Sequence, residues 1–132
     1  MNQIEEDGEE NETVYFFDAY AIIEILEENP AYEKYKDKKT TITIFNLVEI
    51  YWSCLDNFNE QELNKIYSAY KEAVVEIDDE TLKEAIKFRK ELKKKDLSYA
   101  DAIGYIYAKR HNMKFLTGDK EFESLDNVEF VR

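Results

Sequence analysis

After residue 12, short apolar or β-branched runs alternate with longer stretches in which apolar residues recur every three or four positions. The short runs are typical of buried strands, and the longer stretches are typical of helices packed on one face. Strands are predicted over residues 14–17, 41–44, 73–77, 114–117 and 128–131. Helices are predicted over residues 19–28 with a second piece at 31–37, and over 47–56, 60–71, 80–95 and 99–111.

This alternation predicts an α/β fold. Because a helix crosses between successive strands, each new strand returns in the same direction and the pairing is parallel. We therefore expect a three-layer α/β/α sandwich around a central, mostly parallel five-stranded sheet. In the last helix, small residues at Ala100, Gly104 and Ala108 form one smooth stripe, which suits close contact with the sheet.

The length of 132 residues fits one domain. The first twelve residues are polar and acidic with little to bury, so residues 1–12 are predicted to be a disordered acidic tail. The folded domain is then residues 13–132. The charges that interrupt the apolar stretches, and the lack of a basic-then-apolar start, predict a soluble cytoplasmic protein with no membrane partner.

Several site chemistries are excluded by residue counts. Cys54 is the only cysteine and His111 the only histidine, so neither an internal disulfide nor a zinc site built from Cys and His is possible. The two lie in different predicted elements with no nucleophile motif around either. Gly118, which follows a predicted strand, does not begin a phosphate-binding loop.

The net charge of −12 at first disfavours a nucleic-acid partner. Six of the 30 acidic residues lie in the tail, which leaves 24 against 18 basic residues in the domain. Two divalent ions bound by the remaining carboxylates would add about +4 and bring the domain close to neutral. The charge therefore does not exclude RNA.

Four carboxylates are predicted to lie at one edge of the sheet. Asp18 follows the first strand and Asp119 the fourth, while Glu49 and Asp101 are placed in the first turns of helices that begin at that same edge. In open parallel sheets, ligands bind at the carboxyl ends of the strands where the strand order reverses. If the fourth strand pairs beside the first, Asp18 and Asp119 become neighbours.

Helix capping is the alternative interpretation of the same residues. Asp18 can cap the first helix, Asn46-x-x-Glu49 and Ser98-x-x-Asp101 match capping boxes, and Asp119 can cap a turn that ends at Phe122. Against it, Glu49 lies in an apolar run, where an unpaired carboxylate is costly to bury. Gathered carboxylates also repel one another unless a cation lies between them.

An all-oxygen ligand set favours a hard cation such as Mg²⁺. Sites of this kind activate water and neutralise charge on a phosphoryl group, so phosphodiester hydrolysis is the predicted chemistry. A phosphatase with an aspartate nucleophile is disfavoured, because it needs a second carboxylate two residues after Asp18, where Tyr20 stands.

These residues resemble those of the PIN domain ribonucleases, and among them the VapC-type toxins of toxin–antitoxin modules. The resemblance spans residues 14–131. Its carriers are Tyr15-Phe16-Phe17-Asp18-Ala19, Asn46-Leu47-Val48-Glu49-Ile50, Ser98-Tyr99-Ala100-Asp101-Ala102 and Leu116-Thr117-Gly118-Asp119-Lys120-Glu121-Phe122. One departure is Ala19, where the family often has Thr or Ser.

The resemblance implies an endoribonuclease that depends on Mg²⁺ or Mn²⁺. Its catalytic and metal-binding residues are Asp18, Glu49, Asp101 and Asp119. Thr117 is the hydroxyl that orients Asp119, and Asn46 is a second supporting residue. We expect RNA as the substrate, an antitoxin protein as a further partner, and a homodimer. A catalytically silent PIN-like binding or scaffold module, with the carboxylates acting as caps, is the second hypothesis.

Other features have two interpretations each. Lys93, Lys94 and Lys95 end a basic helix close to the predicted site and are weak candidates for RNA binding, although cations near a helix C-terminus also stabilise the helix dipole. Tyrosines in the last helix can stack on bases but more often fill a core. Trp52 is predicted to lie in the core.

Overall fold

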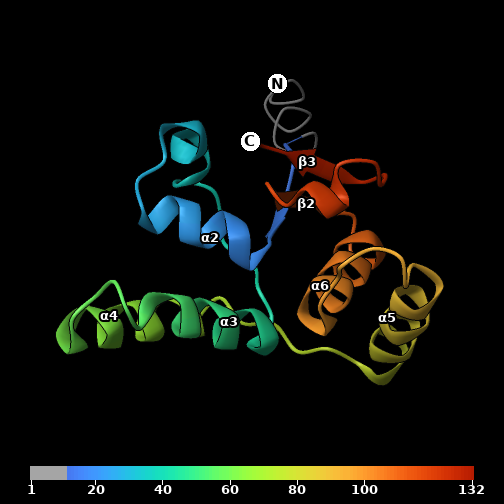
Figure 1. Ribbon diagram of the computed structural model, residues 1–132, viewed down its shortest axis with the longest axis horizontal. Coiled ribbons are helices and arrows are strands. Elements are labelled where there is room, and N and C mark those ends of the chain that lie inside the picture. The colour runs from blue at the N-terminus through green and yellow to red at the C-terminus, as the bar shows by residue number, and fades with distance from the viewer. Residues whose placement is uncertain (1–11) are drawn as a thin grey trace, which may run out of the picture.

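The computed structural model describes residues 12–132, and its elements follow the predicted alternation (Figure 1). The strands are β1 (Tyr15–Phe17), β2 (Lys114–Thr117) and β3 (Val128–Phe130). The helices are α2 (Ala19–Leu26), α3 (Ile44–Cys54), α4 (Glu60–Lys71), α5 (Asp79–Glu91) and α6 (Tyr99–Arg110), with 3-10 turns η1 (Pro30–Tyr35) and η2 (Lys120–Phe122). Apart from Glu12, the predicted disordered tail lies outside the described residues.

The sheet has the order β1-β2-β3, and both pairs are parallel. The register places Phe17 beside Leu116, so the strands β1 and β2 end at the same edge. The prediction that residues 114–117 pair beside the first strand is therefore confirmed. This pairing places the residues that follow β1 next to the residues that follow β2.

The prediction of five strands is wrong in number for the described residues, which contain three. The predicted strands 41–44 and 73–77 meet only at one isolated parallel bridge, between Ile42 and Val74. The predicted strand 41–44 is cut short because helix α3 already begins at Ile44, so the backbone there is helical and cannot extend the strand. One main-chain hydrogen bond of 3.0 Å, from the Phe17 amide to the Thr41 carbonyl, joins this segment to β1, so it lies as a short edge beside the sheet.

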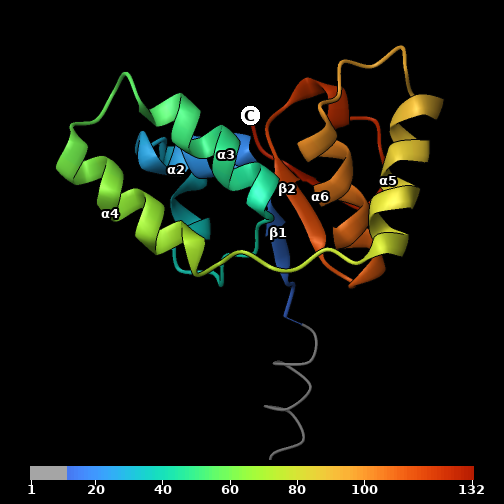
Figure 2. The same ribbon diagram turned by 90° about the horizontal axis from the view of Figure 1, so that it is seen from below.

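Each face of the sheet has its own hydrophobic core, because successive strand residues point to opposite sides. Phe17 and Leu116 pack with residues of α2, η1 and α3, whereas Phe16 and Phe115 pack with residues of α5 and α6. Figure 2 shows the result, with α2, α3 and α4 on one side of β1 and β2, and α6 and then α5 on the other. The three-layer α/β/α arrangement is thus confirmed.

Two element boundaries differ from the prediction in ways that affect the site. Helix α3 begins three residues early because Thr43 caps it by accepting from the Asn46 amide. Helix α5 ends at Glu91, where Leu92 leaves the helical region (φ −102°, ψ 36°), so Lys93–95 lie in a turn rather than in the helix. Among residues 12–132, no helix has both the length and the apolar character that a membrane crossing needs.

Candidate active site

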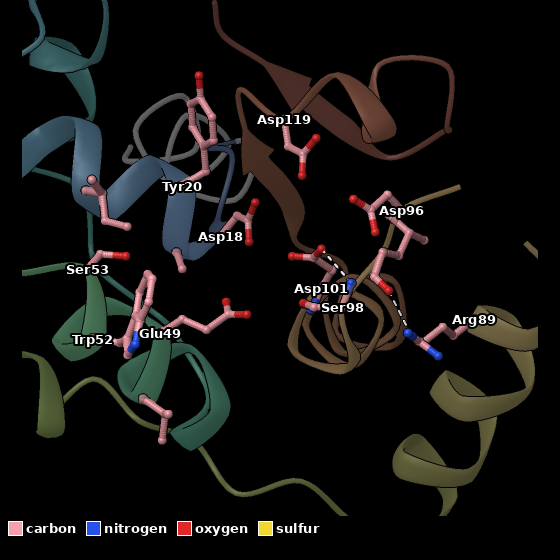
Figure 3. Close-up of a pocket in the computed structure, with 14 residues that line it drawn as sticks. Asp18, Tyr20, Glu49, Trp52, Ser53, Arg89, Asp96, Ser98, Asp101 and Asp119 are labelled. Atoms are coloured by element: carbon pink, nitrogen blue, oxygen red, sulfur yellow. Dashed lines mark hydrogen bonds between the residues drawn. The ribbon is translucent and has the colours of Figure 1, made fainter. Parts of the chain in front are cut away.

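A cleft of about 660 Å³ opens at the carboxyl edge of β1 and β2. All four predicted carboxylates line it: Asp18 after β1, Glu49 on α3, Asp101 at the start of α6, and Asp119 after β2. Figure 3 shows them around one common space, each from a different element. The predicted edge is therefore the place where these side chains come together.

Asp18 is the most buried of the four carboxylates, with only 2% of its surface exposed. Its Oδ2 accepts a hydrogen bond of 2.7 Å from the Thr117 hydroxyl, while its Oδ1 has no hydrogen-bond partner within residues 12–132. Asp18 stands at the N-cap position of α2 but makes no capping bond there. A buried oxygen without a partner is costly, so this carboxylate is held in place for something other than capping.

Asp101 does take part in a capping box. Its Oδ2 accepts from the Ser98 amide at 2.9 Å, and its own amide donates to the Ser98 hydroxyl at 3.0 Å. This predicted capping box is confirmed. Because the carboxylate also lines the cleft, the cap fixes the side chain at the edge of the common space.

Glu49 lies in the second turn of α3, not in the first turn as predicted, because the helix begins at Ile44. The predicted Asn46-x-x-Glu49 box does not form. Asn46 is instead the N3 partner of Thr43: its Oδ1 accepts from the Thr43 amide and hydroxyl, both at 2.8 Å. It is fully buried and does not line the cleft, so its contribution to the site is to set where α3 begins.

Asp119 begins the turn η2, and its Oδ1 accepts from the Glu121 amide at 3.0 Å. Its backbone amide donates to the Thr117 hydroxyl oxygen at 3.0 Å. The buried Thr117 hydroxyl thus bridges the two strand ends, since it also donates to Asp18. The sequence predicted a contact of Thr117 with Asp119 and missed the one with Asp18, which only the pairing of β1 with β2 creates.

Burial and mutual repulsion raise the pKa of three of these groups. The pKa of Asp18 lies well above its ordinary value because the group is buried and because the Asp101 carboxylate lies nearby. Burial also raises the pKa of Asp101, and burial followed by the Asp101 charge raises that of Glu49. Such a cluster favours either bound protons or a bound cation, since both remove the repulsion.

The donor set fits a hard divalent cation: four carboxylates with no sulfur or nitrogen ligand, and one buried oxygen, Asp18 Oδ1, that lacks a partner. Within residues 12–132, however, no three His, Cys, Asp or Glu side chains stand close enough together to hold one ion as they are. The four carboxylates therefore share one cleft, as expected, but they do not yet surround a common point. Closing them around an ion requires side-chain movement.

The cleft also has lining residues that were not predicted for the site, among them a fifth carboxylate, Asp96. Trp52 was expected in the core but is 75% exposed and lines the cleft wall, one helical turn after Glu49. The spacing of three residues on one helix face was the signal that could have placed it. Arg89 is the only cation among the residues of the described chain that line the cleft; it comes from α5, the predicted basic helix, whose end the sequence placed close to the site without singling out Arg89.

The lysines predicted for RNA binding are separate from the acidic cleft. Lys93 and Lys95 line a neighbouring hollow, and Lys94 lines neither cavity. Of the tyrosines in α6, Tyr105 and Tyr107 are buried, as favoured by the core interpretation, whereas Tyr99 is 57% exposed.

Comparisons with known proteins agree on the fold. The sequence matches the family model described as PIN domain over residues 15–128. Similar solved structures include a toxin–antitoxin complex from Klebsiella pneumoniae (TM-score 0.69, 18% identity, 87% of this chain and 95% of that chain). VapBC2 from Rickettsia felis bound to a promoter DNA fragment is also similar (TM-score 0.67, 14% identity, 91% of this chain and 100% of that chain). So is VapBC-1 from nontypeable Haemophilus influenzae (TM-score 0.63, 17% identity, 89% of this chain and 96% of that chain). No curated protein matches the sequence.

Proposed function

The chain belongs to the PIN domain family, and on that basis we propose that it is a metal-dependent endoribonuclease that hydrolyses RNA phosphodiester bonds as the toxin of a toxin–antitoxin pair in the cytoplasm. One observation carries the proposal. Asp18 is buried, its Oδ1 has no partner in the described part of the chain, and four further carboxylates line the cleft beside it, those of Glu49, Asp96, Asp101 and Asp119.

In this proposal Asp18, Glu49, Asp101 and Asp119 are the catalytic residues and together hold Mg²⁺ or Mn²⁺. Bound there, the ion supplies an activated water and offsets the charge that develops on the phosphoryl group. The protein fixes the groups that do this: the Thr117 hydroxyl holds Asp18 by its Oδ2 and the chain at Asp119 by its amide.

An antitoxin protein as partner is also part of the proposal. Its support is that the similar structures from Klebsiella pneumoniae, Rickettsia felis and Haemophilus influenzae are of toxin–antitoxin or VapBC proteins, with a shared fold over most of this chain. The homodimer expected from the sequence stays a prediction, which light scattering on the purified chain can test.

The scaffold hypothesis is favoured by a specific observation and is kept as the second candidate. Asp101 and Asp119 both accept hydrogen bonds from backbone amides, as capping residues do. Capping does not explain Asp18, which stands at an N-cap position without capping and pairs with a side chain 99 residues away.

The test is cleavage of RNA by the purified chain with Mg²⁺, with Mn²⁺ and with an excess of chelator. We expect products with either metal, none with the chelator, and an unchanged circular dichroism spectrum, because the two hydrophobic cores do not depend on the ion. The control is Asp18→Asn purified in the same way, which detects a contaminating ribonuclease. Full activity after chelation, or equal activity of the variant, would reject the proposal.

A further inference from the structure

A second cavity, which we call the basic hollow, lies next to the acidic cleft between the end of α5 and the start of α6. Its volume is about 350 Å³, within the range of small-ligand sites. It is lined by Ile86, Arg89, Lys90, Lys93, Lys95 and Tyr99. Four of these six residues are cations and none is acidic, in a protein whose net charge is −12. The hollow therefore concentrates positive charge where the rest of the surface is predominantly negative.

Arg89 joins the two cavities, because it lines both the acidic cleft and the basic hollow. Figure 3 shows Arg89 reaching from α5 toward the start of α6. Its Nε donates to the Leu97 carbonyl at 2.8 Å, and its guanidinium carbon lies 4.1 Å from the centre of the Tyr99 ring. Within residues 12–132 it forms no salt bridge, and its two terminal nitrogens make no hydrogen bond. A guanidinium held in this way presents both terminal nitrogens to a phosphate without further ordering.

The hollow also offers flat and apolar surface. Tyr99 is 57% exposed and Ile86 is 47% exposed, although isoleucine is a residue type that is usually buried. A tyrosine ring with a guanidinium stacked on it is a surface on which nucleic-acid bases stack. Cations and an exposed aromatic ring together fit a ligand that carries both phosphates and planar bases.

We propose that the basic hollow binds a nucleotide of single-stranded RNA next to the phosphate that is cut in the acidic cleft, with Arg89 holding the phosphate between them. This inference rests on the proposed ribonuclease function. Unpaired RNA is favoured over a duplex because the bases of a duplex are stacked on each other and cannot reach Tyr99. An acidic peptide would use the four cations but has no planar base to place on the ring.

The lysine triplet after α5 provides a matched control. Lys93 and Lys95 line the hollow, while Lys94 between them is exposed and lines neither cavity. Lys93→Ala with Lys95→Ala removes two cations from the hollow, and Lys94→Ala removes one cation of the same segment. If binding depends only on the general charge of this surface, the effect per lysine is equal. If binding depends on the hollow, only the Lys93/Lys95 double variant weakens it.

Binding is measured by fluorescence anisotropy of a labelled unpaired RNA in Mg²⁺, with every variant built on Asp101→Asn so that the RNA stays intact. We expect the Lys93/Lys95 double variant to lower the slope of log Kd against log salt by about 1.4, near 0.7 for each lost phosphate contact. Tyr99→Leu should weaken binding about fivefold or more through lost stacking. Lys94→Ala should change neither quantity.

Arg89→Gln tests the junction between the cavities. The glutamine amide keeps a donor for the Leu97 carbonyl, but the charge and both terminal nitrogens are lost. We expect binding about tenfold weaker, the scale of a charge-assisted hydrogen bond, and an unchanged melting temperature. In the chain that carries a native Asp101, the same change should raise KM for RNA much more than it lowers kcat.

The outcomes separate this inference from the proposed function. If the chain cleaves RNA but the Lys93/Lys95, Tyr99 and Arg89 variants bind it as the Lys94 control does, the hollow is not a subsite although the enzyme stands. If the variants weaken binding and no preparation cleaves RNA, the hollow is supported as an RNA-binding site and the ribonuclease proposal fails. If unpaired RNA does not bind, or if a duplex or a poly-glutamate peptide binds equally and loses affinity equally, the inference is overturned.

Discussion

A variant at Asp101 distinguishes the enzyme hypothesis from the scaffold hypothesis most clearly, because the Asp101 carboxylate both caps α6 and lines the cleft. Asp101→Asn keeps an oxygen for the Ser98 amide and removes the negative charge. The chain contains a matched control in α4, where Asn59 and Glu62 form the same reciprocal box with bonds of 2.8 and 2.9 Å. Glu62→Gln makes the same change from carboxylate to amide at the same helix position, away from the cleft.

If both residues are only caps, the two variants should behave alike. Losing a carboxylate in the first turn weakens its interaction with the helix dipole by about 0.3–1 kcal/mol. Ser98→Ala, which removes the hydroxyl that accepts from the Asp101 amide, should cost about 0.5–2 kcal/mol. For a chain of this size these losses lower the melting temperature by about 4 °C per kcal/mol.

If Asp101 is a metal ligand, Asp101→Asn departs from its control. Burial raises the pKa of Asp101, and its charge is the main neighbouring charge acting on both Asp18 and Glu49. Removing that charge relieves repulsion, so the metal-free variant should be as stable as the wild type or more stable. Cleavage should fall about a hundredfold or more, the scale of a lost transition-state-stabilising group. Mg²⁺ should raise the melting temperature of the wild type and not that of the variant.

The assay combines thermal unfolding with and without Mg²⁺ and the initial rate of RNA cleavage. Glu62→Gln should leave both the rate and the Mg²⁺ effect unchanged while costing a few tenths of a kcal/mol. Near-normal cleavage by Asp101→Asn, with a loss of stability equal to that of Glu62→Gln, would refute the reasoning and return the chain to the scaffold class.

Three further changes probe the framework of the site. Gly104→Ala would place a Cβ 2.6 Å from a ring carbon of Phe16, so it should cost about 1–3 kcal/mol of overpacking, and an unchanged melting temperature would contradict this close approach. Asp18→Asn should stabilise the metal-free protein at neutral pH. Since folding raises the pKa of Asp18, the folded chain holds more protons than the unfolded one between the ordinary and raised values, and wild-type stability falls as pH rises through that window. Urea unfolding at several pH values should show the advantage shrinking as pH falls toward about 4, and a pH-independent advantage would argue against it. Thr117→Val leaves Asp18 Oδ2 and the amide of Asp119 without partners and should cost about 1–3 kcal/mol for each, while Thr117→Ser should restore stability and cleavage; equal losses in both variants would show that the hydroxyl is unimportant.

The layer arrangement and the edge that carries the site were predictable because both follow from the order of elements along the chain. A strand, a crossover helix and a returning strand imply parallel pairing, and parallel strands end at one edge. Asp18 and Asp119 were therefore predictable as neighbours without any knowledge of side-chain packing. The extent of the sheet was not predictable in the same way, because Thr43 caps α3 where strand propensity alone would continue the strand.

Side-chain exposure on α3 was predicted poorly. The run of apolar residues around Glu49 indicated a buried helix, and from it Trp52 was assigned to the core. The structure leaves Val48 63% and Trp52 75% exposed, while Leu47 and Ile50 are buried. The face of α3 that carries Leu47 and Ile50 therefore packs into the core, and the apolar face that carries Val48 and Trp52 is exposed to solvent. Periodicity cannot distinguish the two faces when both are apolar. Glu49 is only half-buried, so its carboxylate costs less to desolvate than its apolar neighbours in the sequence suggested.

Capping and metal binding, which the sequence left as alternatives, are compatible with each other, because a carboxylate has two oxygens. Asp18 uses Oδ2 for the Thr117 hydroxyl, Asp101 uses Oδ2 for the Ser98 amide, and Asp119 uses Oδ1 for the Glu121 amide. The other oxygen of Asp18, Oδ1, makes no hydrogen bond within residues 12–132, and all three carboxylates line the cleft. One oxygen of each carboxylate holds the side chain in position, through a capping bond in Asp101 and Asp119 and through the Thr117 hydroxyl in Asp18, and such a bond is compatible with binding a ligand in the cleft. It follows that Asp→Asn at these places, which keeps the positioning oxygen, tests the chemistry, whereas Asp→Ala would remove position and chemistry together.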